Sequence, residues 1–119
     1  MVNVDYDAEH NAVLIAFEGE IDAAQAVRSF SVLEQVLPKG RGGFKVLADF
    51  SSVDAMEPEV EGVIVKAMEF LNAQGVAEVV RVLPDPDLDI GFDIMSRAHY
   101  SKRVRIQTVR SREEALARL

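Results

Sequence analysis

Cysteine and tryptophan are absent from this sequence of 119 residues, and histidine occurs only twice. Without cysteine the chain cannot form disulfides, thiolate zinc sites or iron–sulfur clusters, and it has no cysteine nucleophile. No apolar run approaches the roughly 18 residues that would predict a membrane span. The N-terminus has neither the basic region nor the apolar region of a secretory signal. These absences predict a cytoplasmic protein that does not bind a membrane.

Basic residues are also fewer than acidic ones: the chain has 13 Lys and Arg and 20 Asp and Glu, which gives a net charge of -7. This balance argues against nonspecific binding to nucleic acid, which needs a positive surface to displace counterions from phosphate. The charge is uneven, since residues 1–96 hold 6 basic and 18 acidic side chains and residues 97–119 hold 7 basic and 2 acidic. A solvated basic face is the simpler interpretation of the last segment. A docking edge for an acidic partner, or for a second copy in a homodimer, is the other.

Length and hydrophobic content indicate one globular domain over residues 1–119. With 49% hydrophobic residues, the chain is long enough for one core but hardly for two. Apolar runs predict strands over residues 2–6, 12–17, 44–50, 76–83 and 104–109. Helices are predicted after Asp22, after Glu57, over residues 90–97 and after Ser111. The order predicts an α/β fold, with a mixed, mostly parallel sheet of about five strands, an N-terminal antiparallel hairpin and about four helices.

Two helix starts carry a capping signal. Asp22 is followed three residues later by Gln25, which predicts a capping box in which each side chain bonds the backbone N–H of the other. Ser111 opens the last helix with the same spacing to Glu114. These signals predict where the first and last helices begin.

The second helix is expected to begin with Pro58 in its first turn, since the missing N–H of proline has no partner there in any helix. Negative charge near this position suits the positive end of the helix dipole, and three acidic residues supply it: Glu57, Glu59 and Glu61. We expect a loop over residues 51–56 before this helix. A rigid acidic turn is expected over residues 84–89, where two prolines alternate with aspartate.

No constellation of catalytic residues is recognisable. His10 lies in the predicted hairpin loop and His99 follows a helix, and neither has the nucleophile and carboxylate that a general base needs. No serine has the Gly-x-Ser-x-Gly context of a nucleophile elbow. Gly40, Gly42 and Gly43 precede a strand and do not open a helix, so they do not form a phosphate-binding loop. We therefore expect no enzymatic activity, no metal and no cofactor.

An acidic cluster at the carboxyl ends of the strands allows one alternative. Glu20, Asp22 and Asp49 could hold Mg²⁺ in a receiver-like site, with Asp49 accepting phosphate. A receiver also needs a lysine at the end of a late strand, where this chain has Arg103 and Arg105. We favour a structural interpretation, in which Asp22 caps a helix and Asp49 accepts hydrogen bonds from loop amides.

Three segments together resemble STAS domains, the family of sulfate-transporter and anti-sigma-factor-antagonist domains. Residues 17–24, Phe-Glu-Gly-Glu-Ile-Asp-Ala-Ala, resemble the Gly-Glu-Leu-Asp-Ala signature between the second strand and the first helix of that family. Residues 46–53 are similar to its apolar strand ending in Asp-Leu-Ser-x-Val. Residues 104–116 resemble its final strand and Glu-Ala-Leu helix. The resemblance covers roughly residues 12–119 and follows the predicted order of elements.

The resemblance implies a noncatalytic regulatory module that binds an anti-sigma factor or a serine kinase. In the family, the kinase phosphorylates a serine in an Asp-Ser-(Ser/Thr)-Gly motif at the start of the second helix. Counted from Asp49, that motif falls here on the residues Glu57-Pro58-Glu59-Val60. Pro58 has no hydroxyl, so the usual phosphorylation is not expected, and Ser51 and Ser52 are weak substitutes further upstream.

The expected partner-binding residues are the four of this motif together with Asp22 and Asp49. Glu57 and Glu59 place fixed negative charge where phosphoserine would stand. That charge imitates a permanently phosphorylated module, or it only stabilises the helix start.

A small-ligand binder is the other function left open. Related α/β folds hold lipids or nucleotides, and flexible methionines at positions 56, 68 and 95 could line a pocket. The Mg²⁺-dependent phosphoacceptor at Asp49 is a third hypothesis.

Overall fold

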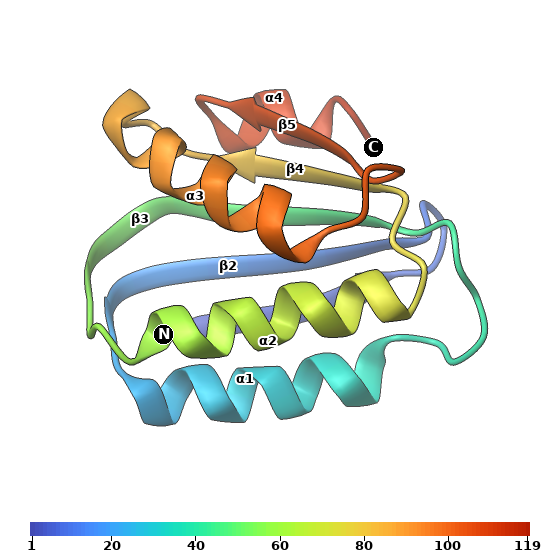
Figure 1. Ribbon diagram of the computed structural model, residues 1–119, viewed down its shortest axis with the longest axis horizontal. Coiled ribbons are helices and arrows are strands. Elements are labelled where there is room, and N and C mark those ends of the chain that lie inside the picture. The colour runs from blue at the N-terminus through green and yellow to red at the C-terminus, as the bar shows by residue number, and fades with distance from the viewer.

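Five strands form one sheet whose spatial order follows the chain, β1-β2-β3-β4-β5 (Figure 1). The computed structural model describes the backbone of residues 1–119 and the side chains of residues 1–85 and 91–119. The strands are β1 (Val2–Asp7), β2 (Ala12–Ile21), β3 (Lys45–Met56), β4 (Glu78–Val82) and β5 (Arg105–Val109). The helices are α1 (Ala23–Val36), α2 (Val60–Ala73), α3 (Pro86–His99) and α4 (Arg112–Leu116). β1 runs antiparallel to β2 and the other neighbours are parallel, which confirms the predicted fold class.

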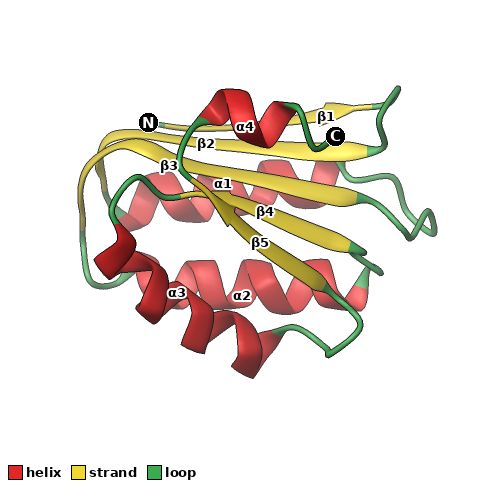
Figure 2. Cartoon of the chain, turned by 90° about the horizontal axis from the view of Figure 1, so that it is seen from above, coloured by secondary structure: helices red, strands yellow, loops and turns green.

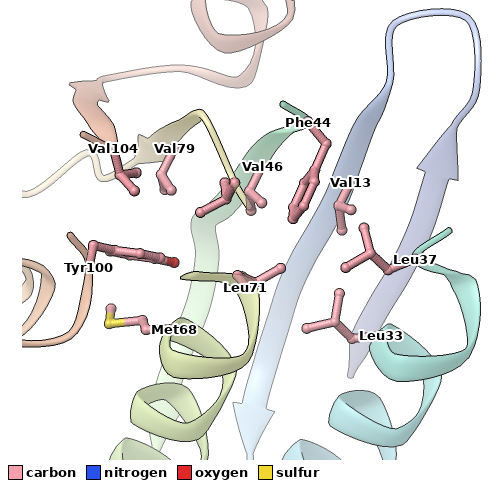
Figure 3. Close-up of a cluster of buried hydrophobic side chains, with 11 residues drawn as sticks. Val13, Leu33, Leu37, Phe44, Val46, Met68, Leu71, Val79, Tyr100 and Val104 are labelled. Atoms are coloured by element: carbon pink, nitrogen blue, oxygen red, sulfur yellow. The ribbon is translucent and has the colours of Figure 1, made fainter. Parts of the chain in front are cut away.

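The sheet separates two layers of helices. α1, α2 and α3 cover one face, and α4 lies on the other (Figure 2). Successive residues of a strand point to opposite faces, so Val46 packs into the larger core while Leu47 packs with Ala115 of α4. In the larger core, Leu33 of α1 and Leu71 of α2 meet the sheet (Figure 3). Burial on both faces explains why the central strands are continuous apolar runs in the sequence.

The capping box predicted at Asp22 is confirmed. Asp22 Oδ1 accepts the N–H of Gln25 at 2.8 Å, and Gln25 Oε1 accepts the N–H of Asp22 at 3.4 Å. At the start of α4, Ser111 Oγ accepts the N–H of Glu114 at 3.2 Å, which is one of the two bonds predicted there. Local side-chain chemistry therefore sets where both helices begin.

The prediction of a loop over residues 51–56 is wrong, because these residues continue β3. They pair with the second half of β2, which runs on to Ile21. The register shifts between Ala16 and Glu18 and again between Gly19 and Glu20, and at each shift β3 has one residue more than β2. Gly19 has a φ of 72°, a conformation that costs other residues energy. Such bulges bend a strand pair, and β3 curves toward the start of α2 (Figure 1).

Two helix boundaries also differ from those expected. α2 begins at Val60, so Pro58 does not lie in its first turn. Pro58 lies in a preceding turn, which is closed by the 3.0 Å bond from the Val60 N–H to the Glu57 carbonyl. α3 begins at Pro86 and not at Ile90, because the proline ring suits the first position of a helix. The predicted acidic turn over residues 84–89 therefore overlaps α3, and the side chains of residues 86–90 lie outside the described part. Among the described residues, no helix has the length and apolar content to cross a membrane.

Candidate interaction surface

The turn between β3 and α2 holds the four residues expected to contact a partner. Glu57, Pro58 and Glu59 are exposed. Val60 is fully buried against Ile21 and Ala26. Val60 therefore anchors the turn on the core, and the other three residues form the surface that a partner can reach.

Glu57 links this turn to the neighbouring junction between β2 and α1. Its backbone N–H donates to the carbonyl of Ile21 at 3.0 Å, and its Oε1 accepts the N–H of Ala23 at 3.0 Å. Asp22, which caps the same helix, is exposed beside this link. The fold therefore brings Asp22 and Glu57 to one end of the sheet, where their carboxylates face the positive end of α1.

Asp49 lies on the opposite face of the sheet, beneath α4. Its side chain is 6% exposed. Asp49 Oδ1 accepts the N–H of Ser51 at 2.9 Å and the hydroxyl of Ser51 at 2.5 Å. Arg112 of α4 donates to Asp49 Oδ2 at 3.3 Å. Asp49 thus ties a bulge of β3 to α4, and it does not belong to the surface around Glu57.

The receiver-like magnesium site is not assembled. Among the described residues, three side chains that could hold a metal ion have their ligand atoms within 4.8 Å of one another. They are Asp7, Glu9 and His10. Glu20, Asp22 and Asp49 do not meet this distance, because Asp49 points to the other side of the sheet. The described structure therefore does not bring together the three carboxylates on which the hypothesis of a phosphoacceptor at Asp49 was based.

Ser51 and Ser52, the substitute phosphorylation candidates, are exposed residues within β3 and not in a loop. The Ser51 hydroxyl is already held by Asp49. Strand pairing with β2 restrains the backbone at Ser52. Neither serine lies in the turn before α2, so the structure separates both from the position at which the resemblance places phosphorylation.

A groove opens beside the turn. It has a volume of about 560 Å³ and lies between the end of β3, the start of α2 and α3. It is lined by Phe50, Val53, Asp54, Ala55, Met56, Glu57, Pro58, Glu61, Ile64, Leu83, Gly91, Phe92 and Met95. Two of the three methionines proposed for a pocket are in this list. The third, Met68, lies in the core (Figure 3).

A row of three aromatic rings runs from the sheet to the groove. Phe17 of β2 stacks on Phe50 of β3 with ring centroids 4.5 Å apart, and Phe50 meets Phe92 of α3 at 4.6 Å. Offset and tilted ring pairs contribute about 0.5–1.5 kcal/mol each beyond the area they bury. The row therefore fixes α3 against the sheet and makes the floor of the groove rigid.

Beneath the groove, a buried arginine joins α3 to β4 and β5. Arg81 is 3% exposed and donates to Ser96 Oγ at 2.8 Å and to Thr108 Oγ1 at 3.2 Å. Burial raises the pKa of the neighbouring Tyr100 phenol far above its ordinary value, and the charge of Arg81 opposes that shift only in part. Tyr100 therefore stays neutral at physiological pH. These groups belong to the packing of α3 and do not reach the surface.

Solved structures with the same arrangement of elements are known. An uncharacterized protein of the DUF3478 family from Shewanella loihica, described as having a SpoIIAA-like fold, is 10% identical with a TM-score of 0.74, over 100% of this chain and 92% of that one. The anti-sigma factor antagonist SpoIIAA in its unphosphorylated form is 16% identical with a TM-score of 0.66, over 99% of this chain and 96% of that one. The chain has a STAS-like fold. The phosphorylated form of the Bacillus cell fate determinant SpoIIAA is 16% identical with a TM-score of 0.65, over 99% of this chain and 98% of that one.

The STAS-like fold confirms the resemblance seen in the three sequence segments. No family model matches the sequence, and no curated protein is significantly similar to it. The likeness is therefore one of structure at low sequence identity. In this STAS-like domain the turn before α2 carries Pro58, flanked by two exposed glutamates.

Proposed function

We propose that this STAS-like domain is a noncatalytic cytoplasmic regulatory module that binds a protein partner through the turn Glu57-Pro58-Glu59. By resemblance the partner is an anti-sigma factor or a kinase-like protein. The observation that carries the proposal is the exposed, anchored turn at the start of α2. Val60 and the Glu57 bonds hold it in one conformation, so little conformational entropy is lost when a partner binds.

The proposed module is not switched by phosphorylation, because Pro58 offers no hydroxyl at this turn and Ser51 and Ser52 lie outside it in β3. Glu57 and Glu59 supply negative charge there at all times. Intact mass spectrometry of the protein isolated from its own cells tests this point, with an unmodified mass as the expected result. A phosphate on Ser51 or Ser52 would contradict it.

The binding surface is tested by comparing glutamine variants in affinity capture from lysate of the source cells. We expect a specific partner for the wild type and weaker capture with Glu57→Gln and Glu59→Gln combined. Glutamine keeps an oxygen that can accept the Ala23 N–H, so the variant removes charge without removing that bond. Glu69→Gln, at an exposed position further along α2, is the matched control. The proposal fails if no partner is captured, or if both variants capture it equally.

Binding of a small apolar ligand is a second candidate function, and the groove of about 560 Å³ favours it. Pockets of this size hold drug-sized molecules. The carboxylates at its rim, Asp54, Glu57 and Glu61, repel phosphate, so a lipid-like ligand suits it better than a nucleotide. Native mass spectrometry of freshly isolated protein should show an adduct if this function is right.

Self-association is a separate proposal. β1 and β5 are the edges of the sheet, and an open edge can pair with a second copy. Asp5 and Arg105 place charge on these edges, which discourages pairing. Analytical ultracentrifugation over a range of concentrations tests for a homodimer.

A further inference from the structure

The groove combines two kinds of surface, apolar and acidic. Its floor and walls are apolar, with Phe50, Ile64, Leu83 and Phe92 among the lining residues. Its rim next to α2 is acidic, since Asp54, Glu57 and Glu61 also line it and are exposed. An occupant must therefore bury apolar groups and carry positive charge.

On α3, Gly91 lines the groove without contributing a side chain. A Cβ built at Gly91 would have no other atom within 4 Å. Glycine inside a helix costs stability relative to alanine, so Gly91 is not explained by the needs of α3 itself. A larger residue at this position therefore meets no clash at its Cβ.

Two methionines make the lining of the groove adaptable. Met56 at the end of β3 and Met95 on α3 line the groove and are half-buried. Methionine is unbranched and flexible, and it is common at surfaces that accept varied apolar side chains. The rigid aromatic floor and the adaptable walls together suit a set of side chains from another protein.

We infer that the groove binds a basic amphipathic segment of the partner protein, with apolar side chains between β3 and α3 and Lys or Arg beside Asp54 and Glu61. This inference rests on the proposed function and extends its surface from the turn into the groove. Charge complementarity identifies the occupant, because the rim is acidic on the side that borders the turn. An anionic ligand would meet three carboxylates there.

The experiment uses the full chain and synthetic peptides of about 15 residues, near the length at which an isolated helix becomes stable. The probe carries Leu and Phe on one helical face and Lys and Arg on the other. One control peptide has Glu in place of the basic residues, and a second has Ser in place of the apolar ones. Fluorescence anisotropy should show binding of the probe that is at least about tenfold tighter than binding of either control.

Variants of the chain locate the site. Gly91→Leu should weaken binding of the probe about tenfold or more, because the new side chain occupies the groove. Gly62→Leu is the matched control, since Gly62 is an exposed helical glycine with equal free space that does not line the groove. Asp54→Asn with Glu61→Gln should weaken binding several-fold at low salt and reduce its salt dependence. Unfolding curves of each variant verify that the fold is retained.

Chemical-shift perturbation by the probe should centre on Ile64, Phe92 and Met95. The inference is overturned if Gly91→Leu binds the probe as well as Gly62→Leu does, or if the acidic peptide binds equally well. It is also overturned if a peptide of residues 97–119 of this chain binds most tightly and Gly91→Leu abolishes a dimer, since the occupant would then be a second copy.

The two proposals fail in different ways. If capture of a partner depends on Glu57 and Glu59 but not on Gly91, the groove inference fails and the proposed function stands. If the basic peptide binds the groove but no protein partner is captured, the proposed function fails while the groove chemistry stands.

Discussion

The side chain of Glu57 closes the N-terminus of α1, because its Oε1 accepts a 3.0 Å hydrogen bond from the backbone N–H of Ala23. The first N–H groups of a helix have no partner within the helix. Asp22, at the start of the same helix, accepts one of these N–H groups. Glu57 accepts another, that of Ala23, although it lies 34 residues further along the chain. Glu57, which we propose contacts a partner, thus also holds two junctions of the fold together.

Replacing Glu57 should reveal this structural role. We expect Glu57→Ala to lower the free energy of unfolding by about 1 kcal/mol, the usual effect of removing a helix cap. Urea denaturation measures the change, and Glu57→Gln should retain most of the stability because it keeps an acceptor oxygen. Equal stability of wild type and Glu57→Ala would show that the bond to Ala23 contributes nothing.

Asp49 should prove structural and not metal-binding. Asp49→Asn loses the charge that faces Arg112 and keeps only one of the two carboxylate oxygens, of which Oδ1 accepts from Ser51 and Oδ2 from Arg112. We therefore expect a loss of about 1–3 kcal/mol of stability. Ser52→Ala, at an exposed neighbour, serves as the control. Adding Mg²⁺ to the wild type should leave its unfolding midpoint unchanged, and stabilisation by Mg²⁺ that disappears in Asp49→Asn would argue for a metal site after all.

The bond between Ser96 and Arg81 should matter for α3. Ser96→Ala removes the acceptor at 2.8 Å from a guanidinium that is buried between α3 and the sheet. We expect a cost of about 1–3 kcal/mol, since a buried charged donor then lacks one of its acceptors. Thermal unfolding measures it, with Ser31→Ala at an exposed position of α1 as the control. If both variants unfold at the same temperature, Ser96 is dispensable.

The hairpin between β1 and β2 contains a pH-dependent pair. His10 Nδ1 lies 2.7 Å from Asp7 Oδ2, and hydrogen bonds from the His10 side chain and backbone hold the pKa of Asp7 below its ordinary value. A lowered pKa means that the folded state favours the ionised carboxylate. The resulting stability is present above the ordinary pKa and is lost as pH falls through the folded-state pKa.

An NMR titration of the Asp7 carboxyl carbon should therefore have its midpoint below 3.8. His10→Ala should move that midpoint upward. A midpoint that is the same in both proteins would show that the pair does not form in solution.

Most of the fold could be predicted because its signals are local. The alternation of β1, the apolar runs of β3 and β4 and the capping residues Asp22 and Ser111 each act over a few residues. An apolar run marks only the buried part of a strand. The end of β3 was missed because Ser51 to Met56 form a largely exposed strand, which has no apolar run and is held by pairing with β2.

The surface around the turn could be predicted only in part. The exposure of Glu57 and Glu59 follows from their charge, whereas the burial of Val60 and the position of Asp49 under α4 depend on which face of the sheet each residue meets. A single polar residue in an apolar strand does not reveal which helix covers it.

Composition and local pattern were thus sufficient for the α/β class, the order of strands and helices along the chain and the absence of thiol chemistry, since each depends on residue type or on neighbours in the chain. The groove and the Glu57–Ala23 bond required the folded molecule. Gly91, Ile64 and Val53 are ordinary residues in three separate segments, and they line one groove only where β3, α2 and α3 are packed together. Long-range packing creates such a site, and no short stretch of sequence contains it.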